Sequence, residues 1–97
     1  MKLRILDSAL EDLDRGRLFY ERQGEGLGPY FLDSLFAEID SLILYAGVHR
    51  KVFGFHRLIV RRFPYGVYYR LEEDGVVVVW RVLDLRRSPS WIRKALS

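Results

Sequence analysis

The stretch RRFPYGVYYRLEEDGVVVVWRVLDLRR, residues 61–87, decides the fold. Aromatic and β-branched residues fill two runs within it. The segment EEDG between the runs contains Asp-Gly, a pair that suits the positive φ of a tight hairpin turn. We therefore expect two antiparallel strands, Tyr65–Leu71 and Val76–Leu83. The second run is apolar on both faces, which indicates a strand inside the sheet.

Three further strands are predicted from the rest of the chain. Short runs with alternating or β-branched residues suggest strands at Lys2–Leu6, Val52–Phe55 and Arg57–Phe63. With the hairpin, these segments form one small sheet, which we expect to be mostly antiparallel.

Two amphipathic helices are predicted before the sheet strands. Ser8 and Glu11 form a capping-box pattern, so the first helix should begin there and run to about residue 22. Pro29 suits the first position of a second helix that runs to residue 46, where Gly47 provides a stop. Two such helices joined by a short turn should pack as an antiparallel hairpin on the sheet.

The elements together predict an α+β fold in one domain, residues 1–97. Its parts are an N-terminal strand, the antiparallel helix hairpin, the sheet and a short C-terminal helix. Ser88 or Ser90 should cap that last helix, which contains Trp91, Ile92 and Leu96.

The composition predicts a cytoplasmic protein without cofactor or metal. The chain has no cysteine, which excludes disulfides and thiolate metal sites, and it begins without the apolar segment of a secretory signal. The longest apolar run, Val76–Trp80, is far short of the roughly 20 residues that span a membrane. His49 and His56 have no acidic ligand nearby, and Ser88 and Ser90 have no adjacent base.

The second half of the chain is basic. From His49 onward there are eleven Lys or Arg residues against four Asp or Glu, although the net charge is only +3. Such a surface suits phosphate groups or an acidic protein segment.

Strand alternation predicts which residues form this surface. Tyr65, Val67 and Tyr69 should face the helices, whereas Tyr68 and Arg70 should face away from them. The target-binding residues expected on the open face and the last helix are Arg57, Arg61, Tyr68, Arg70, Arg81, Arg86, Arg87, Trp91 and Arg93. Arginine binds phosphate and carboxylate bidentately, and Tyr68 could stack on a base. The alternative is that these arginines only solvate an uncovered sheet face.

One enzymatic alternative stays open. A ribonuclease without metal can work with clustered Arg and Tyr side chains, which stabilise charge and donate a proton. Its candidate catalytic residues are Arg61, Tyr68, Arg81 and Arg86.

Several short motifs resemble the RelE/ParE toxins of bacterial type II toxin-antitoxin systems. They are an Ala-x-x-Asp-Leu helix (Ala9, Asp12, Leu13), a Gly-Leu-Gly turn, Arg-Phe-Pro-Tyr, Val-Tyr-Tyr and Arg-Arg-Ser-Pro, in this order over nearly the whole chain. The resemblance implies a growth inhibitor of the plasmid-stabilisation type, neutralised by a cognate antitoxin. RelE-like members cut messenger RNA on the ribosome, whereas ParE-like members inhibit DNA gyrase.

The departures from the RNA-cleaving pattern favour the ParE-like function, inhibition of gyrase by binding. Gly66 stands where the cleavers carry an arginine, and Trp91 stands at their tyrosine and has no hydroxyl proton to donate. The second arginine of the RNA-cleaving members, after the last strand, falls near Leu85 or Arg86. Their two basic residues on the strand before Tyr65 correspond roughly to Arg57 and Ile59. The alternatives are a RelE-like messenger RNA endoribonuclease with a non-standard site, or a non-toxic relative that only binds its antitoxin.

The resemblance also predicts how partners bind. An acidic amphipathic antitoxin segment should cover the helix hairpin and part of the arginine face, burying roughly 1,000 Å² or more. Charge reversal at Arg61 or Arg81 should weaken target binding without unfolding the domain. Without the antitoxin, exposed apolar surface could drive homodimers.

Overall fold

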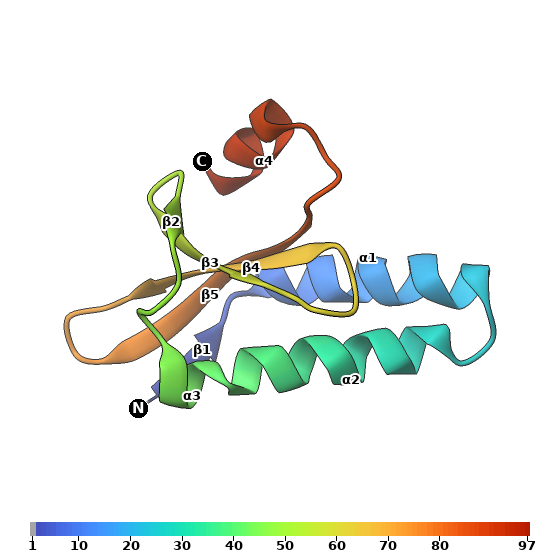
Figure 1. Cartoon of the computed structure of the whole chain (residues 1–97), viewed down its shortest axis with the longest axis horizontal. Helices are drawn as coiled ribbons and strands as arrows, with labels where there is room; N and C mark the ends of the chain where they lie inside the picture. The colour runs from blue at the N-terminus through green and yellow to red at the C-terminus, as the bar shows by residue number, and fades with distance from the viewer. Residues whose placement is uncertain (1) are drawn as a thin grey trace.

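The structure is a computed structural model that describes residues 2–97, with a sheet of five strands and four helices (Figure 1). In chain order the elements are β1 (Lys2–Ile5), α1 (Asp7–Gln23), α2 (Leu27–Asp40), α3 (Leu42–Tyr45), β2 (Lys51–Val52), β3 (Phe55–Ile59), β4 (Tyr65–Leu71), β5 (Val76–Asp84) and α4 (Pro89–Leu96). The expected α+β architecture is confirmed. The β3 strand ends at Ile59, before the Phe63 that the sequence suggested.

The sheet has the order β1-β5-β4-β3-β2. Neighbouring strands are antiparallel except β1 and β5, which pair in parallel from Lys2 opposite Val76 to Ile5 opposite Val79. The β5 strand therefore lies inside the sheet, as its two apolar faces predicted. Gly75 in the β4–β5 turn has a φ of 82°, as expected for the Asp-Gly pair.

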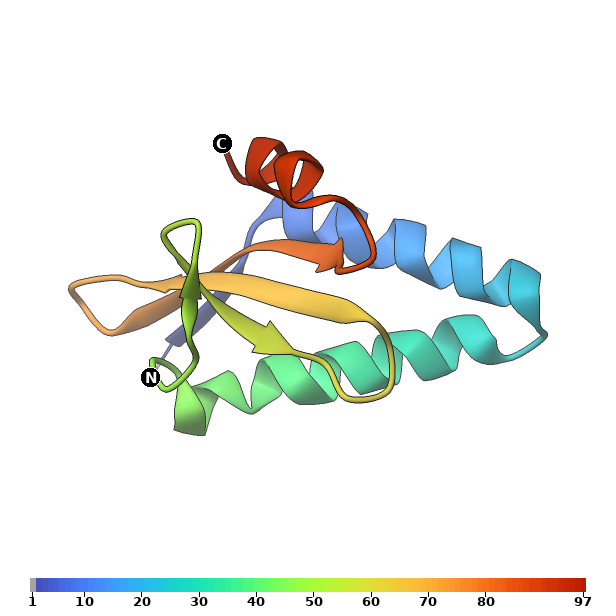
Figure 2. The same ribbon diagram turned by 45° about the horizontal axis from the view of Figure 1, so that its top comes forward.

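The α1–α2 hairpin covers one face of the sheet and forms the main core with it (Figures 1 and 2). The predicted alternation of β4 is confirmed, because Tyr65, Val67 and Tyr69 all lie in this core. Gly16 lets the two helices approach closely, since a Cβ atom there would lie 2.4 Å from Cζ of Phe31.

The first helix does not begin with the predicted capping box. Leu6 is the N-cap residue and no side chain caps the helix. Ser8 instead donates a hydrogen bond of 3.0 Å to the carbonyl oxygen of Trp80 on β5. The serine thus joins α1 to the sheet, a tertiary contact that the local pattern could not reveal.

The second predicted helix is divided in two. The α2 helix starts at Leu27, after Gly26 with a φ of 85°, so Pro29 is its third residue and not its first. It ends at Asp40, and the one-turn α3 follows after Ser41. Gly47, with a φ of 96°, follows α3 as the predicted stop.

The α4 helix packs on the sheet face opposite the main core. Its residues Ile92 and Leu96 are buried against Phe55, Tyr68 and Leu83. Ser88 caps the helix by accepting a hydrogen bond of 3.2 Å from the amide of Trp91, as expected. The sheet therefore has apolar contacts on both faces, and only part of the second face stays open.

Candidate target-binding site

The residues predicted to bind a target do not form one surface. Tyr68 is buried and Arg81 is half-buried. Arg70 is exposed but lies over the rings of Phe55 and Trp80, with its guanidinium carbon 4.0 and 5.1 Å from their centroids. The other predicted residues form two groups at the surface. One comprises the half-buried Arg57 on β3 and the exposed Arg61 just after it, and the other follows β5 with the exposed Arg86, Arg87, Trp91 and Arg93.

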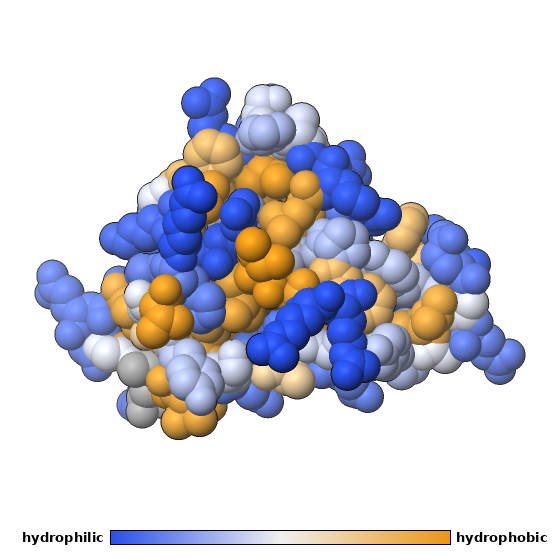
Figure 3. Space-filling model, viewed as in Figure 1, coloured by the Kyte–Doolittle hydropathy of each residue, from blue (hydrophilic) through white to orange (hydrophobic). Residues whose placement is uncertain are grey.

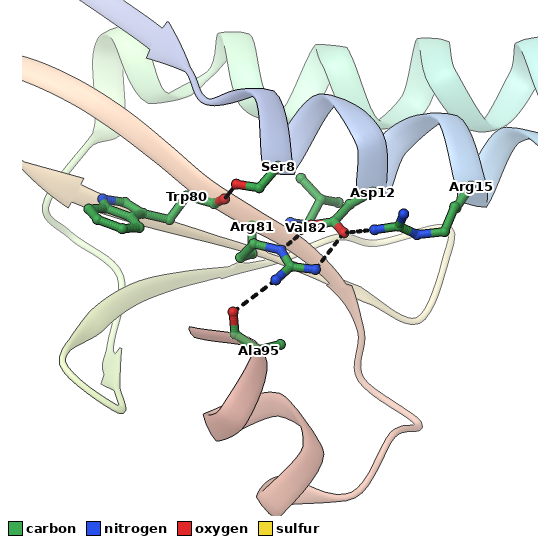
Figure 4. Close-up of polar contacts among 7 residues, drawn as sticks. All are labelled: Ser8, Asp12, Arg15, Trp80, Arg81, Val82 and Ala95. Atoms are coloured by element: carbon green, nitrogen blue, oxygen red, sulfur yellow. Dashed lines mark hydrogen bonds and ion pairs between the residues drawn. The ribbon is translucent and has the colours of Figure 1, made fainter. Parts of the chain in front are cut away.

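Arg81 is held by Asp12 of α1 and by the end of α4 (Figure 4). Its Nε and Nη2 donate to the two carboxylate oxygens of Asp12 at 2.7 and 2.8 Å. Its Nη1 donates to the carbonyl oxygen of Ala95 at 2.8 Å. The hydrogen bonds that Arg81 donates to Asp12 raise the pKa of Arg81 above its ordinary value. Arg81 thus joins three elements and is not free to bind a target.

Arg81 lies on the face of β5 that the alternation predicted, opposite Tyr68, but the alternation could not indicate its pairing with Asp12. Tyr68 lies opposite Arg81 but Tyr69 lies opposite Val79, so β5 has one extra residue there. Val79 and Val82 both enter the main core, whereas strict alternation would put them on opposite faces. Charge reversal at Arg81 should disturb the fold, contrary to the expectation from the sequence, because a glutamate there would face the carboxylate of Asp12.

The prediction that Tyr68 could stack on a base is also wrong for this structure. Its side chain points away from α1 and α2 as expected, but α4 covers it and leaves it 0% exposed. The alternation correctly gave the face, but could not indicate that the last helix returns over it. Figure 3 shows an apolar strip across this side of the molecule, flanked by hydrophilic side chains.

Gly66 has no room for the arginine of the RNA-cleaving pattern. A Cβ atom on Gly66 would lie 3.0 Å from Cδ2 of Leu85, 3.2 Å from Cγ of Arg57 and 3.3 Å from Cε1 of Tyr68. These three side chains fill the position on the sheet surface. A larger residue at position 66 would require these side chains to shift.

The exposed group after β5 forms what we call the C-terminal basic surface, which consists of Arg15, Phe19, Arg86, Arg87 and Trp91. All of these residues except Arg86 line a hollow of about 340 Å³ between α1 and the end of β5. The guanidinium of Arg87 lies 4.6 Å from the centroid of the Trp91 ring, and that of Arg86 lies 6.0 Å from the Phe19 ring. Cationic and aromatic side chains thus lie together around one opening, which the paired carboxylates of Asp12 and Asp84 also line.

The loop at this surface is fixed by an ion pair. Arg86 donates from Nη2 to Asp84 at 2.8 Å, and its backbone amide donates to the same carboxylate at 2.9 Å. Burial alone would raise the pKa of Asp84, but the hydrogen bonds from Arg86 outweigh it and lower that pKa. Burial raises the pKa of nearby Tyr65 to about 12, so this hydroxyl stays protonated at neutral pH.

The two histidines lie elsewhere, against β4. His49 Nδ1 is 2.5 Å from the hydroxyl of Tyr69, and His56 donates from Nδ1 to the carbonyl oxygen of His49 at 2.7 Å. Within residues 2–97, no group of three or more potential ligands is placed to hold a metal ion. None of the helices in that range is long and apolar enough to cross a membrane.

The profile of a family described as the ParE toxin of the type II toxin-antitoxin system, parDE, matches residues 3–89. The chain belongs to the ParE toxin family. The matched region includes the sheet, the helix hairpin and the Asp84–Arg87 loop, and it ends where α4 begins. Membership in the RelE/ParE group, which the motifs suggested, is thereby confirmed.

A solved structure supports the ParE-family fold. It is described as the chromosomal ParDE TA system from P. aeruginosa, and it superposes with a TM-score of 0.79 at 21% identity. The alignment covers 88% of this chain and 96% of that chain. The comparison with curated proteins found no match.

Three residues of the site were not among the predicted ones. Asp12 was noted only as part of a motif, although an acid between Ala9 and Leu13 on the apolar stripe of α1 already indicated a buried partner. Arg15 and Phe19 lie on the same helix and carried no separate signal. Their role depends on how α1 packs beside β5, which the sequence did not indicate.

Proposed function

We propose that this ParE-family protein is a cytoplasmic toxin that arrests growth by binding DNA gyrase, and that it does not act as a nuclease. In this proposal the C-terminal basic surface is the contact with the target. An acidic, partly apolar patch on the target suits it, because Arg15 and Arg87 stand beside the rings of Phe19 and Trp91.

The observation that carries the proposal is that most of the candidate catalytic residues are covered or paired. Tyr68 is enclosed beneath α4, Arg81 is paired with Asp12 and Arg86 with Asp84. Arg61 belongs to the other exposed group, along β3. Metal-independent RNA cleavage needs accessible groups for charge stabilisation and proton donation at one point. Tyr68 and Arg81 are neighbours on adjacent strands, but the first is covered and the second is paired with Asp12.

The proposal includes a cognate antitoxin that neutralises the toxin. The helix hairpin exposes apolar side chains, among them Leu10, Leu18 and Phe36. An amphipathic antitoxin segment would remove them from water, and acidic residues on it would pair with exposed arginines.

The first test is induction of the protein alone in bacteria, with DNA and protein synthesis pulse-labelled in the first minutes of growth arrest. We expect DNA synthesis to fall first. An earlier fall in translation would contradict the proposal and favour an endoribonuclease. Normal growth at high expression would also contradict it and favour a non-toxic relative.

The second test is a supercoiling assay with purified gyrase. We expect Arg87→Glu and Trp91→Ala each to raise the half-inhibitory concentration by ~10-fold or more, because both remove contacts at the centre of the surface. Arg22→Glu, on the exposed last turn of α1, makes the same charge change elsewhere and should behave like the wild type. Equal inhibition by all variants would exclude this surface as the contact.

A further inference from the structure

The turn between β2 and β3 holds a phenylalanine in a backbone conformation that this residue rarely adopts. Phe53 has a φ of 54°, the only positive φ of a non-glycine residue within residues 2–97, and the following Gly54 has a φ of 83°. Because Val52 pairs with Phe55, Phe53 and Gly54 form the whole loop of the hairpin. Positive φ at both loop positions is typical of a type I′ turn, in which asparagine or glycine usually takes the first place. A bulky side chain at this position strains the backbone.

Packing does not account for this strain. The side chain of Phe53 is 43% exposed, and it belongs to neither of the two apolar clusters of the described residues. The flanking Val52 and Phe55 are the residues that hold the turn against α4 and the sheet. Residues that keep a strained backbone are concentrated at sites that bind partners. The turn thus presents an aromatic ring to solvent in a conformation that asparagine would adopt with less strain.

Arg70 of β4 lies beside the same turn and has no anionic partner. Its Nη2 atom is 4.0 Å from the position that a Cβ atom on Gly54 would take. Its guanidinium carbon lies over the rings of Phe55 and Trp80, as described above. Within residues 2–97 the guanidinium forms no ion pair. Because the two rings already orient this group, it loses little freedom on binding a carboxylate or a phosphate.

The charges around the turn favour a carboxylate of a protein over a nucleic acid. Residues 41–71 contain six Lys or Arg residues and no Asp or Glu, which favours a negative partner. Glu72, Glu73 and Asp74, however, follow Arg70 within four residues of the chain. These three carboxylates would repel the continuous negative charge of a nucleic acid backbone. A single carboxylate beside an apolar side chain can bind Arg70 without approaching them.

We infer that Phe53 and Arg70 form a second contact with the protein target of the C-terminal basic surface. The ring of Phe53 enters an apolar pocket of the target, and Arg70 binds a carboxylate at the rim of that pocket. The β2–β3 turn lies on one side of α4, and the C-terminal basic surface lies on the other side, next to α1 (Figures 1 and 2). The target therefore contacts the toxin on both sides of α4. The inference rests on the proposed binding of gyrase, to which it adds this second contact.

The test measures the dissociation constant between purified gyrase and variants at the turn. Phe53→Asn removes the ring but suits the positive φ, and we expect it to weaken binding by ~10-fold or more. Phe53→Tyr keeps an aromatic ring on the same backbone and should stay within about twofold of the wild type. Leu10→Asn is the matched control, because Leu10 on α1 is 44% exposed and lies outside both contacts.

The contribution of Arg70 is measured in the same way. Arg70→Gln removes the charge but keeps a polar side chain, and it should also weaken binding by ~10-fold or more, because a carboxylate of the target loses its partner. Arg22→Gln makes the same change at the exposed end of α1 and should bind like the wild type.

Unfolding in urea gives a readout that a purely structural role of Phe53 would move in the opposite direction. Phe53→Asn should lower the equilibrium constant of unfolding by ~5-fold or more, because it relieves the strained backbone. Leu10→Asn removes a similar exposed side chain from a helix and should not stabilise the protein. If Phe53→Asn destabilises the protein, the phenylalanine serves the fold and the inference is overturned.

The outcomes separate this inference from the proposed function. If the wild type binds gyrase and both Phe53→Asn and Arg70→Gln bind equally well, the second contact is excluded and the proposed function stands. If the wild type does not bind gyrase, both fail. Binding of a labelled DNA duplex by the toxin alone, abolished by the same two variants, would overturn the inference in favour of a nucleic acid. The unfolding curves identify any variant that does not fold, and if Arg70→Gln is one, Phe53→Asn decides.

Discussion

Asp12 accepts four hydrogen bonds although its side chain is only 4% exposed. The donors are Arg15, two nitrogens of Arg81 and the backbone amide of Val82. Loss of its charge would leave the partly buried guanidinium of Arg81 without a counter-ion. An uncompensated charge in such a place costs more than the pair contributes when intact.

We therefore predict that Asp12→Ala lowers the free energy of unfolding by about 3 kcal/mol in urea titrations. Asp14→Ala is the control on the same helix, because Asp14 makes only an exposed ion pair with Arg17. Such exposed pairs contribute at most about 1 kcal/mol. Similar losses for both variants would contradict the structural role of Asp12.

His49 should make the stability of the protein depend on pH. Burial, and then the nearby His56, lower the pKa of His49 below its ordinary value of 6.5. The unfolded chain binds the proton more readily than the folded protein does. The contribution of neutral His49 to the free energy of unfolding is therefore complete above pH 6.5. It is lost as the pH falls from there through the lowered pKa of the folded protein.

The measurement is the free energy of unfolding between pH 8 and pH 5.5, for the wild type and for His49→Gln. We expect the wild type to lose stability toward acid more steeply than the variant, because glutamine does not titrate. A variant with the same slope as the wild type would assign the dependence to other groups.

At the scale of elements, the α1–α2 hairpin depends on the contact between Gly16 and the fully buried ring of Phe31. Alanine favours a helix by about 1 kcal/mol over glycine, but its methyl group would overlap Phe31. Overpacking of this kind typically costs ~1–3 kcal/mol. We expect Gly16→Ala to destabilise the protein in spite of its better helix propensity.

A second substitution tests this explanation. Phe31→Leu removes the atoms that the new methyl group would meet. Gly16→Ala should therefore cost less in the Phe31→Leu background than in the wild type, as a double-mutant cycle in urea would measure. Equal costs in both backgrounds would mean that the two residues do not compete for space.

The elements also indicate what the sequence could and could not predict. Periodicity identified each helix face and strand, because local burial repeats every two or 3.6 residues. Alternation placed Arg81 on the correct face of β5, but its ion pair with Asp12 depends on how α1 packs beside that strand, a long-range contact. The basic residues were found, but their division into two surfaces depends on where α4 packs, a long-range contact without a local signal.

At the scale of the whole molecule, exposed apolar side chains gather at the end of the α2–α3 segment. Leu44 is 78% exposed and Val48 is 73% exposed, with Ile43 and Tyr45 also at the surface. The isolated toxin should therefore self-associate, and the antitoxin should reverse this by covering the same region.

Sedimentation velocity over a range of concentrations measures this prediction. The double variant Leu44→Ser and Val48→Ser should remain monomeric at concentrations where the wild type dimerises, with its unfolding free energy unchanged within about 0.5 kcal/mol. Leu10→Ser, on α1, is the control and should dimerise normally. A wild type that is monomeric throughout would contradict the prediction.

The pairing of β1 with β5 has a consequence for the synthesis of this toxin. The first strand of the chain has no partner until residues 76–79 have been made, and β5 in turn supplies the middle of the sheet. Such distant contacts form late because a long loop must close first. The sheet thus cannot be completed before β5 has emerged from the ribosome, so an antitoxin that recognises the folded toxin can bind only after that point.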